Sequence, residues 1–378
     1  MGEQEKTRPV KEVYERIAVV ANSAWNLLNF RGGLIKALVA AGHQVVLLAP
    51  EGPERPLLEA MGAEFIPLRH LRRKGMNPLR DLRLLREFYR IFHRENVTVS
   101  LLFTIKPVIY GSLAARLARA RNISTLTGLG FTFISTSTTS FIVRALYRMA
   151  LRKADTVFFH NPDDLKHFVE SGLVRKAQAA VVPGSGIALA KYPLAPYSEA
   201  IPGRFLFIGR LLVDKGLREF VAAARFAKKE NPSLSFHVLG PFDADNPAGI
   251  TPLEFDRWVE EGTIVYEGVT DDVRPHLRRA AVVVLPSYRE GCPRALLEAA
   301  ATGRALIGTD VPGVREVVVP GENGWLVPVR DGEALGRCFL RVGDVESLVG
   351  MGIIGRERVE LCFGLDRVVE AYMLAVSC

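Results

Sequence analysis

The sequence predicts an α/β protein with two doubly wound, Rossmann-like domains. Short apolar runs rich in β-branched residues alternate with helix-like segments, and this alternation occurs in two series along the 378 residues. A stretch rich in Gly, Pro and Ser separates the two series. Continuous apolar strands joined by crossover helices are typical of parallel sheets buried on both faces. Two series therefore indicate two parallel-sheet domains, which a chain of this length can accommodate.

The predicted strands divide evenly between the two halves. In the first half they cover residues 16–21, 44–49, 97–103 and 155–159. Helical patterns such as those at 34–41 and 79–94 lie between them. In the second half the strands cover residues 205–209, 235–240, 263–268 and 281–286, each followed by a helix-like segment. Each half thus has the strand and helix order of a doubly wound fold.

The domain boundaries follow from where this order breaks. Periodicity is lost at 184–203, which we interpret as a linker. We predict an N-terminal domain over residues 1–190 and a second Rossmann-like domain over residues 191–355. Apolar residues then recur at helical spacing, although Gly364 weakens the pattern, and predict a C-terminal helix within 356–378 that packs back on the first domain.

The two halves differ in charge. Residues 1–190 contain 27 Lys and Arg against 15 Asp and Glu, whereas residues 191–378 contain 22 against 26. A basic half suits anions such as anionic lipid, phosphorylated substrate or nucleic acid. The chain has no RNA-recognition signature and no basic groove interleaved with aromatic residues, so we expect no nucleic-acid partner. A solvated face rich in Arg is the alternative interpretation of the charge.

The composition indicates an intracellular protein. The polar N-terminus lacks the apolar core of a secretory signal, and no window approaches the run of about 18 apolar residues that a spanning helix requires. The four cysteines form no C-x-x-C pair and the histidines do not cluster, so neither a disulfide framework nor a zinc site is indicated. We expect a cytoplasmic location with peripheral contact at the inner face of the membrane.

Two glutamates flank the start of a predicted helix after the strand at 281–286. Glu290 lies in the turn, and Glu298 lies more than one helical turn further on. Carboxylates accept hydrogen bonds from vicinal hydroxyls, and the N–H groups at a helix N-terminus favour a diphosphate. Both features suit a nucleotide sugar. We expect the segment between the glutamates to take part in donor binding, namely Gly291, Pro293 and Arg294.

Two cations follow the strand at 205–209. Arg210 and Lys215 lie on the loop at the end of this strand, flanked by Gly209 and Gly216, which permit close approach of the backbone. Ligands of doubly wound domains bind beyond the carboxyl ends of the strands. We therefore expect both cations to compensate the charge of a diphosphate, most strongly as it departs.

These segments resemble a known family. FIGRLLVDKG and PSYREGCPRALLEAAATGRALIGTDVPGVREVVVPGENGWLVP are similar to the donor-binding half of retaining glycosyltransferases of family 4, which have the GT-B architecture and an E-x7-E signature. The resemblance implies that Glu290 contacts the transferred sugar, that Glu298 binds the nucleotide ribose, and that the two cations bind the diphosphate. It also implies two domains facing across a cleft, a UDP-sugar as donor substrate and no metal.

The first half narrows the resemblance. NFRGGLIKALVAAGHQVVLLAP, GMNPLRDLRLL, TIKPVIYGSLAARLA and TLTGLGFTF are similar to the subgroup that extends saccharides on a polyprenyl diphosphate carrier, often with an N-acetylhexosamine. We therefore expect a metal-independent glycosyltransferase that uses a UDP-sugar and a lipid-linked acceptor in polysaccharide assembly. A nucleotide-sugar 2-epimerase with the same architecture, or a hexosyltransferase with a soluble acceptor, are the alternatives.

Several residues of the first half are candidates for the same site. Gly33 opens a helix after the first strand and permits approach of a phosphate. Lys106 lies beyond another strand and is a candidate for an acceptor diphosphate, with a simple loop lysine as the alternative. Thr127 and Gly128 follow a further short apolar run, where the family often has a histidine and this chain has none. His160 is interpreted as a strand-end residue and not as its replacement.

Two other motifs need an interpretation. Asp243 and Asp245 imitate the D-x-D metal motif of the other major glycosyltransferase fold, but they lie in a connecting loop, so we expect no metal there. Residues 69–94 contain nine Lys and Arg interleaved with apolar residues. Such a stretch can lie on an anionic bilayer or can be a crossover helix with a solvated basic side.

Overall fold

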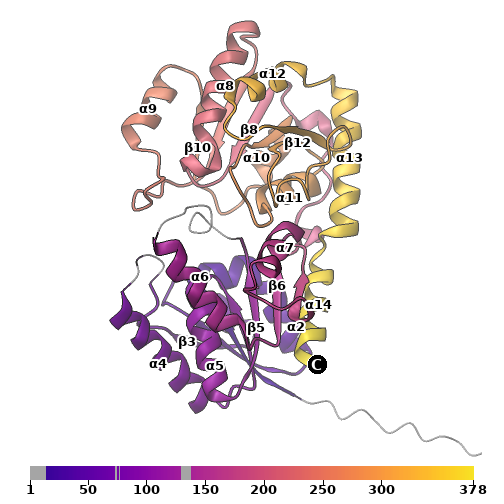
Figure 1. Ribbon diagram of the computed structural model, residues 1–378. Coiled ribbons are helices and arrows are strands. Elements are labelled where there is room, and N and C mark those ends of the chain that lie inside the picture. The colour runs from indigo at the N-terminus through magenta and orange to yellow at the C-terminus, as the bar shows by residue number, and fades with distance from the viewer. Residues whose placement is uncertain (1–13, 73–74, 76, 129–137) are drawn as a thin grey trace, which may run out of the picture. The chain divides into compact units, whose positions relative to one another are not determined.

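The computed structural model describes residues 14–72, 75, 77–128 and 138–378 (Figure 1). The chain forms two compact units. The first comprises Met1–Thr125 with Ala150–Thr156, and the second comprises Leu126–Met149 with Val157–Cys378.

The first sheet has seven strands in the order β3-β2-β1-β4-β5-β6-β7. Its strands are β1 (Arg16–Val20), β2 (Gln44–Ala49), β3 (Glu64–Pro67), β4 (Val99–Phe103), β5 (Arg121–Leu126), β6 (Thr156–Phe159) and β7 (Ala179–Val181). β1 pairs in parallel with β2 and with β4, so the strand order reverses there. This arrangement is the switch point of a doubly wound sheet.

Helices connect the strands of the first sheet. They are α1 (Ala24–Asn26), α2 (Gly32–Ala40), α3 (Arg55–Glu59), α4 (Pro78–Arg94), α5 (Ser112–Ala118), α6 (Thr138–Leu151) and α7 (Pro162–Glu170). Single π-helical turns, η1 (Leu27–Arg31) and η2 (Pro107–Gly111), begin the connections after β1 and β4. The apolar stripe of α4 is buried at Leu84, Phe88 and Phe92, which confirms a crossover helix with one face in the core.

The second sheet has six strands in the order β10-β9-β8-β11-β12-β13. Its strands are β8 (Arg204–Ile208), β9 (Ser235–Leu239), β10 (Val265–Gly268), β11 (Val282–Leu285), β12 (Ala305–Thr309) and β13 (Gly324–Val327). The helices of this part of the chain are α8 (Leu217–Glu230), α9 (Pro252–Glu260), α10 (Arg274–Arg279), α11 (Arg294–Ala301), α12 (Gly332–Arg341), α13 (Val345–Cys362) and α14 (Leu365–Ser377). β8 pairs in parallel with β9 and β11, so the carboxyl ends of β8 and β11 are neighbours.

The predicted class of two doubly wound, parallel-sheet domains is confirmed. All eight predicted strands are present within one or two residues of their expected ends. The core of the second domain contains stacked and edge-on phenylalanines from different elements, among them Phe205, Phe220, Phe236 and Phe339. Their burial explains why these strands are apolar along their whole length.

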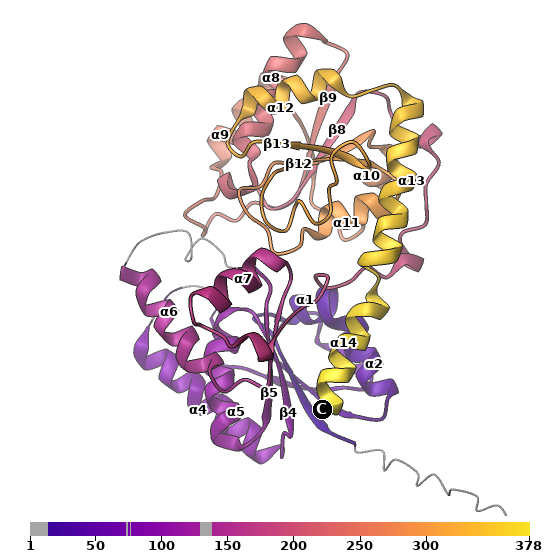
Figure 2. The same cartoon turned by 45° about the vertical axis from the view of Figure 1, so that its right-hand side comes forward.

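The C-terminal segment is two helices and not one (Figure 2). α13 ends at Cys362 and α14 begins at Leu365, so the expected single helical face across Gly364 is wrong. Ile187 stabilises the break, because its N–H donates to the Phe363 carbonyl at 2.9 Å and its carbonyl accepts from the Leu365 N–H at 3.0 Å. These bonds satisfy backbone groups that the helix ends would otherwise leave unpaired.

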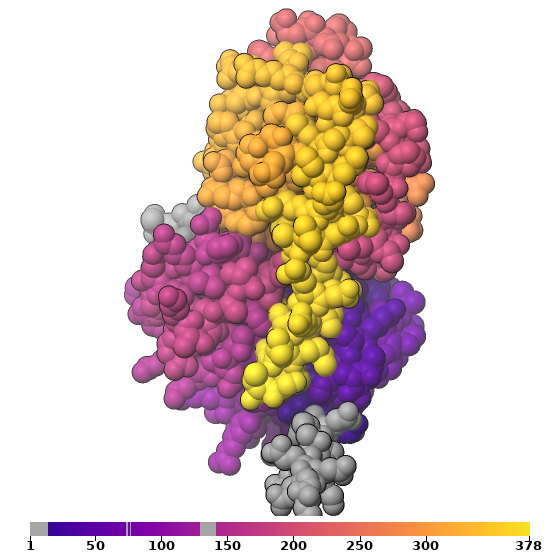
Figure 3. Space-filling view, turned by 90° about the vertical axis from the view of Figure 1, so that its right-hand side faces the viewer, coloured from indigo at the N-terminus to yellow at the C-terminus, as the bar shows by residue number. Residues whose placement is uncertain are grey.

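α14 packs its inner face on β6. The Tyr372 ring lies 4.9 Å from that of Phe158, centroid to centroid. The outer faces of α13 and α14 lie at the surface of the molecule (Figure 3), and Leu361 and Leu374 are exposed there. Among the helices of the described residues, none has both the length and the apolar composition needed to cross a membrane.

Candidate active site

The loops after β8 and β11 bring a cation and a carboxylate together. Lys215 ends a short 3-10 turn, η7 (Val213–Lys215), and Glu290 lies between β11 and α11. The Lys215 Nζ donates to Glu290 Oε1. Both side chains are mostly buried, with 23% and 12% of their surface exposed. Because β8 and β11 are adjacent, the strand order itself places these two residues side by side.

Gly216 allows this approach. Its φ of +72° lies in the left-handed region, and a Cβ there would lie 1.9 Å from the carbonyl oxygen of Pro286. The same two loops are joined by the Asp214 carbonyl, which accepts from the Tyr288 N–H at 2.9 Å and from the Ser287 hydroxyl at 3.1 Å. Only glycine fits at position 216, and its absence of a side chain keeps Lys215 close to Glu290.

Glu298 lies on the buried face of α11 and is held by two partners. Its Oε1 accepts from the Tyr192 hydroxyl and from Arg294 Nε, both at 2.7 Å. Burial, followed by the nearby Glu298 carboxylate, raises the pKa of Tyr192 to about 12, so the hydroxyl keeps its proton. α11 begins at Arg294 and is preceded by Pro293 as its cap residue, one position before the place expected for this proline.

Arg210 is paired with Asp243. Its Nη1 lies 2.7 Å from Asp243 Oδ2, and 40% of the Arg210 side chain is exposed. Gly209 precedes it at the end of β8. The first aspartate of the D-x-D-like motif thus has an arginine partner. Across the part of the chain that the structure describes, no group of three or more His, Cys, Asp or Glu side chains is placed to hold a metal ion.

Two of the candidate site residues, Gly33 and Lys106, lie in the first unit. Gly33 is the second residue of α2, as expected of a glycine that opens a helix. Lys106 Nζ lies 2.8 Å from Asp81 Oδ1, and the Tyr110 hydroxyl donates to the other oxygen at 3.0 Å. Asp81 is buried on α4, so Lys106 is an ion-paired residue with 14% of its side chain exposed. Burial, together with Asp81, raises the pKa of the Tyr110 phenol.

Thr127 and Gly128 lie against the loop that carries Glu290. A Cβ on Gly291 would lie 1.9 Å from the Thr127 carbonyl oxygen and 3.1 Å from the Gly128 nitrogen. Two backbone segments far apart in sequence therefore meet where Gly291 has no side chain. The predictions that fall on residues 129–137, which continue the TLTGLGFTF motif, lie outside the described residues.

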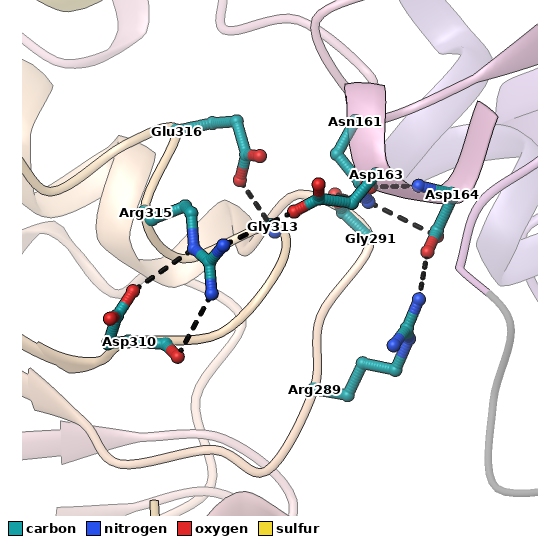
Figure 4. A network of polar contacts seen from close by, with 9 residues as sticks. All are labelled: Asn161, Asp163, Asp164, Arg289, Gly291, Asp310, Gly313, Arg315 and Glu316. Atoms are coloured by element: carbon teal, nitrogen blue, oxygen red, sulfur yellow. Dashed lines mark hydrogen bonds and ion pairs between the residues drawn. The ribbon is translucent and has the colours of Figure 1, made fainter. Parts of the chain in front are cut away.

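Sequence reasoning missed the contacts that α7 makes with this loop (Figure 4). Asp164 Oδ1 forms an ion pair with Arg289 Nη2. The Asn161 side-chain amide donates to the Gly291 carbonyl at 2.9 Å. Asn161 also caps α7, because its Oδ1 accepts from the Asp164 N–H at 2.8 Å. An Asn before a Pro, two residues beyond the predicted strand at 155–159, is the signal for this cap.

A second group of contacts surrounds the loop from the other side (Figure 4). The Glu316 carboxylate accepts from the Gly313 N–H at 2.6 Å, and burial raises the pKa of Glu316. The Glu290 N–H donates to the Pro312 carbonyl at 3.3 Å. Arg315 joins Asp310, at 3.1 Å, to Asp163 on α7, at 3.5 Å. The bond to Pro312 thus fixes the backbone at Glu290, whereas the contacts of Arg315 and Glu316 hold the neighbouring segment, residues 310–316.

Sequence models of two protein families match the chain. The family described as glycosyl transferases group 1 matches residues 202–343, which contain Lys215, Glu290 and Glu298. The family described as glycosyl transferase 4-like domain matches residues 30–184. Together they cover every strand of both sheets except β1.

Individual relatives are similar over most of their length. The chain is 26% identical over 337 residues to the N,N'-diacetylbacillosaminyl-diphospho-undecaprenol alpha-1,3-N-acetylgalactosaminyltransferase of Campylobacter jejuni, covering 85% of this chain and 87% of that enzyme. It is 26% identical to the UDP-Gal:alpha-D-GlcNAc-diphosphoundecaprenol alpha-1,3-galactosyltransferase of Escherichia coli, covering 79% and 81%. Anabaena Alr3699/HepE, solved in complex with UDP-glucose, shares the fold with a TM-score of 0.79 at 17% identity, over 96% of this chain and 100% of that one.

Proposed function

Since the chain belongs to the group 1 glycosyltransferases, with a family 4-like N-terminal domain and the GT-B fold, we propose that it transfers a sugar from a UDP-sugar to a saccharide on a polyprenyl diphosphate. The ion pair between Lys215 and Glu290 is the observation that carries this proposal. We expect this cation to bind phosphate and this carboxylate to bind sugar hydroxyls, beyond the adjacent ends of β8 and β11, where folds of this kind bind ligands.

The two charges of this pair exchange partners when the donor binds. Without donor, Lys215 and Glu290 neutralise each other. A diphosphate offers Lys215 a stronger anionic partner, and the hydroxyls of the donor sugar then take its place on the Glu290 carboxylate. Arg210 supports the diphosphate from the start of the same loop. Its pair with Asp243 uses Nη1, and a guanidinium carries further N–H donors.

Glu298 suits the ribose end of the donor. It lies within α11, whereas Glu290 precedes this helix, and Tyr192 and Arg294 fix the direction of its carboxylate. A fixed carboxylate accepts two vicinal hydroxyls at little cost in side-chain entropy. The N-terminus of α11, between the two glutamates, offers N–H groups to the diphosphate.

The reaction is a substitution on one face of the sugar. The bond from the anomeric carbon to the departing phosphate oxygen breaks, and the bond to the acceptor oxygen forms on the same side, so the configuration is retained. The acceptor proton passes to the departing phosphate oxygen. Lys215, Arg210 and the α11 N-terminus stabilise the charge that develops on this leaving group. No protein base and no metal ion takes part in this scheme, which suits a first-domain loop without the histidine.

The acceptor is inferred from the relatives. The Campylobacter jejuni and Escherichia coli enzymes are named for acceptors on diphospho-undecaprenol and diphosphoundecaprenol. We propose the same class of carrier for this chain, with an N-acetylhexosamine as the sugar transferred.

A donor panel tests the function. The protein is incubated with UDP-GlcNAc, UDP-GalNAc, UDP-glucose or UDP-galactose and a polyprenyl-diphosphate saccharide, and the lipid products are identified by mass spectrometry. We expect one acceptor to gain a single N-acetylhexosamine, with UDP released. Epimerised nucleotide sugar in the absence of acceptor would show a 2-epimerase instead. Extension of a free saccharide, with the lipid-linked one unchanged, would show a soluble acceptor.

A groove beside α4 supports contact with an anionic membrane. It has a volume of about 580 Å³ and is lined by Ile66, Pro67, Arg69, His70, Arg83, Arg86, Glu87, Arg90, Ile91 and Arg94. Glu87, the acidic residue among the described lining residues, accepts from the backbone N–H groups of Arg69 and His70 at 2.8 and 3.0 Å. Leu79 and Leu82 are exposed on the same helix. The groove therefore offers several arginines to phosphate groups next to apolar side chains.

We predict that neutralising the groove releases the protein from vesicles. The variant Arg83→Gln/Arg86→Gln/Arg90→Gln removes three charges, each contributing on the order of 1 kcal/mol near an anionic surface. Binding to vesicles with 30% phosphatidylglycerol should fall by a factor of about 100 in flotation assays. The control changes three exposed arginines of the second unit, Arg225, Arg278 and Arg337, to Gln. Equal loss in both variants would mean that net charge alone, and not this groove, binds the membrane.

A further inference from the structure

The two residues next to Glu290 are anchored to one turn of α7. Arg289, before it, forms its ion pair with Asp164, and Gly291, after it, accepts from Asn161 (Figure 4). All five residues belong to the second unit. Neither anchor touches the Glu290 carboxylate, which faces Lys215. The turn therefore holds the backbone on both sides of Glu290 and leaves its carboxylate available to other partners.

This turn is more deeply buried and makes more hydrogen bonds than the capping of a helix requires. The side chain of Asp164 is completely buried, and Asn161 is also completely buried. Asn161 caps α7 with its oxygen and uses its amide nitrogen twice, toward Asp164 Oδ2 at 3.1 Å and toward the Gly291 carbonyl. A Ser or Thr would cap the helix equally well but has no such second donor. Burial of Asp164 opposes its ionisation, and Arg289 is the cation that compensates.

We infer that Asn161 and Asp164 are positioning residues for Glu290. They fix the loop so that the carboxylate meets the donor sugar when Lys215 turns to the diphosphate. This inference rests on the role of Glu290 in the proposed function. It adds the two residues that fix the position of the Glu290 carboxylate. A displacement of about 1 Å at such a group can lower a rate by a factor of about 100, so small contacts at the flanking residues have a large effect.

The variant Asp164→Asn removes the ion pair and keeps the shape of the side chain. We expect kcat to fall about tenfold, with the KM for donor changed by less than a factor of about three, because the diphosphate and ribose contacts remain. The matched control is Asp163→Asn. It lies on the same turn, is 43% exposed and faces Arg315 at 3.5 Å, so its kcat should stay at the wild-type value.

A second variant separates positioning from folding. Asn161→Ser keeps a cap for α7 but loses the donor to Gly291, and it should also lower kcat with little change in donor KM. Melting temperature and the fraction of active protein are measured for both variants. A loss of activity that follows the loss of folded protein, with wild-type kcat for the folded fraction, would overturn the inference.

The double variant Asp164→Asn/Glu290→Gln shows whether Asp164 affects kcat through Glu290. If Asp164 acts through Glu290, the double variant should have the kcat of Glu290→Gln alone. A further tenfold loss in the double variant would show that Asp164 acts elsewhere and would refute positioning. Wild-type kcat in Asp164→Asn, with a slow Glu290→Gln, would reject the inference and leave the proposed function standing. Wild-type kcat in Glu290→Gln would instead reject the role of Glu290 itself.

Discussion

Replacing Glu290 with Gln is expected to lower kcat at least 30-fold, on the order of 2 kcal/mol of transition-state stabilisation. The amide keeps the volume of the side chain but loses the charge, and a neutral acceptor binds sugar hydroxyls more weakly than a carboxylate. It also loses the charge opposite Lys215, with which Glu290 forms an ion pair. The measurement is steady-state kinetics with saturating UDP-sugar and lipid-linked acceptor.

The control for this variant is Glu322→Gln, an exposed glutamate of the same domain. It should keep wild-type kcat and KM. Because Glu290 is mostly buried, the melting temperature is compared as well. Loss of turnover with an unchanged melting temperature supports the assigned role, whereas wild-type turnover in Glu290→Gln would contradict it.

Replacing Lys215 with Met is expected to have a larger effect, a loss of about 100- to 1,000-fold in kcat/KM for the donor. The methionine keeps the apolar stem of the lysine, so packing beside Gly216 is preserved, but the ammonium that we propose as the partner of the diphosphate is gone. Under this proposal the lost charge acts both on bound donor and, more strongly, on the leaving group. We therefore expect a rise in donor KM together with a fall in kcat.

Inhibition by UDP distinguishes these two contributions. The inhibition constant for UDP should rise in Lys215→Met, because the free nucleotide carries the same diphosphate. The control is Lys229→Met, an exposed lysine near the end of α8. Unchanged UDP inhibition in Lys215→Met would place the diphosphate away from Lys215 and would remove the main support for the site.

The sequence predicted those parts of the fold that depend on local apolar patterning. The strands that it missed are short or contain polar residues, as β5 shows. Asn122 and Ser124 are buried in β5, where the Ser124 hydroxyl donates to Asn122 Oδ1 at 3.0 Å. Such residues lower the hydrophobicity of the segment, so its pattern does not predict a buried strand. Their hydrogen-bond partners become known only from the folded structure.

The same distinction applies to the site. Lys215 and Glu290 follow neighbouring strands, so a rule about strand ends was sufficient to bring them together. Tyr192 lies in the predicted linker, and its bond to Glu298 spans 106 residues. Asp164 and Arg289 are 125 residues apart. No local pattern reports such pairs, because they form only through tertiary packing. The charge of Arg210 predicts it as a site residue, but nothing in the sequence predicts its ion pair with Asp243.

Gly216 has a practical meaning for any mutational survey of this enzyme. Its missing side chain lets the β8 loop lie against the Pro286 carbonyl. A single methyl group at this position would push Lys215 away while leaving every ionisable residue intact. A mutational scan restricted to charged side chains would therefore overlook a position at which one added methyl group can abolish activity.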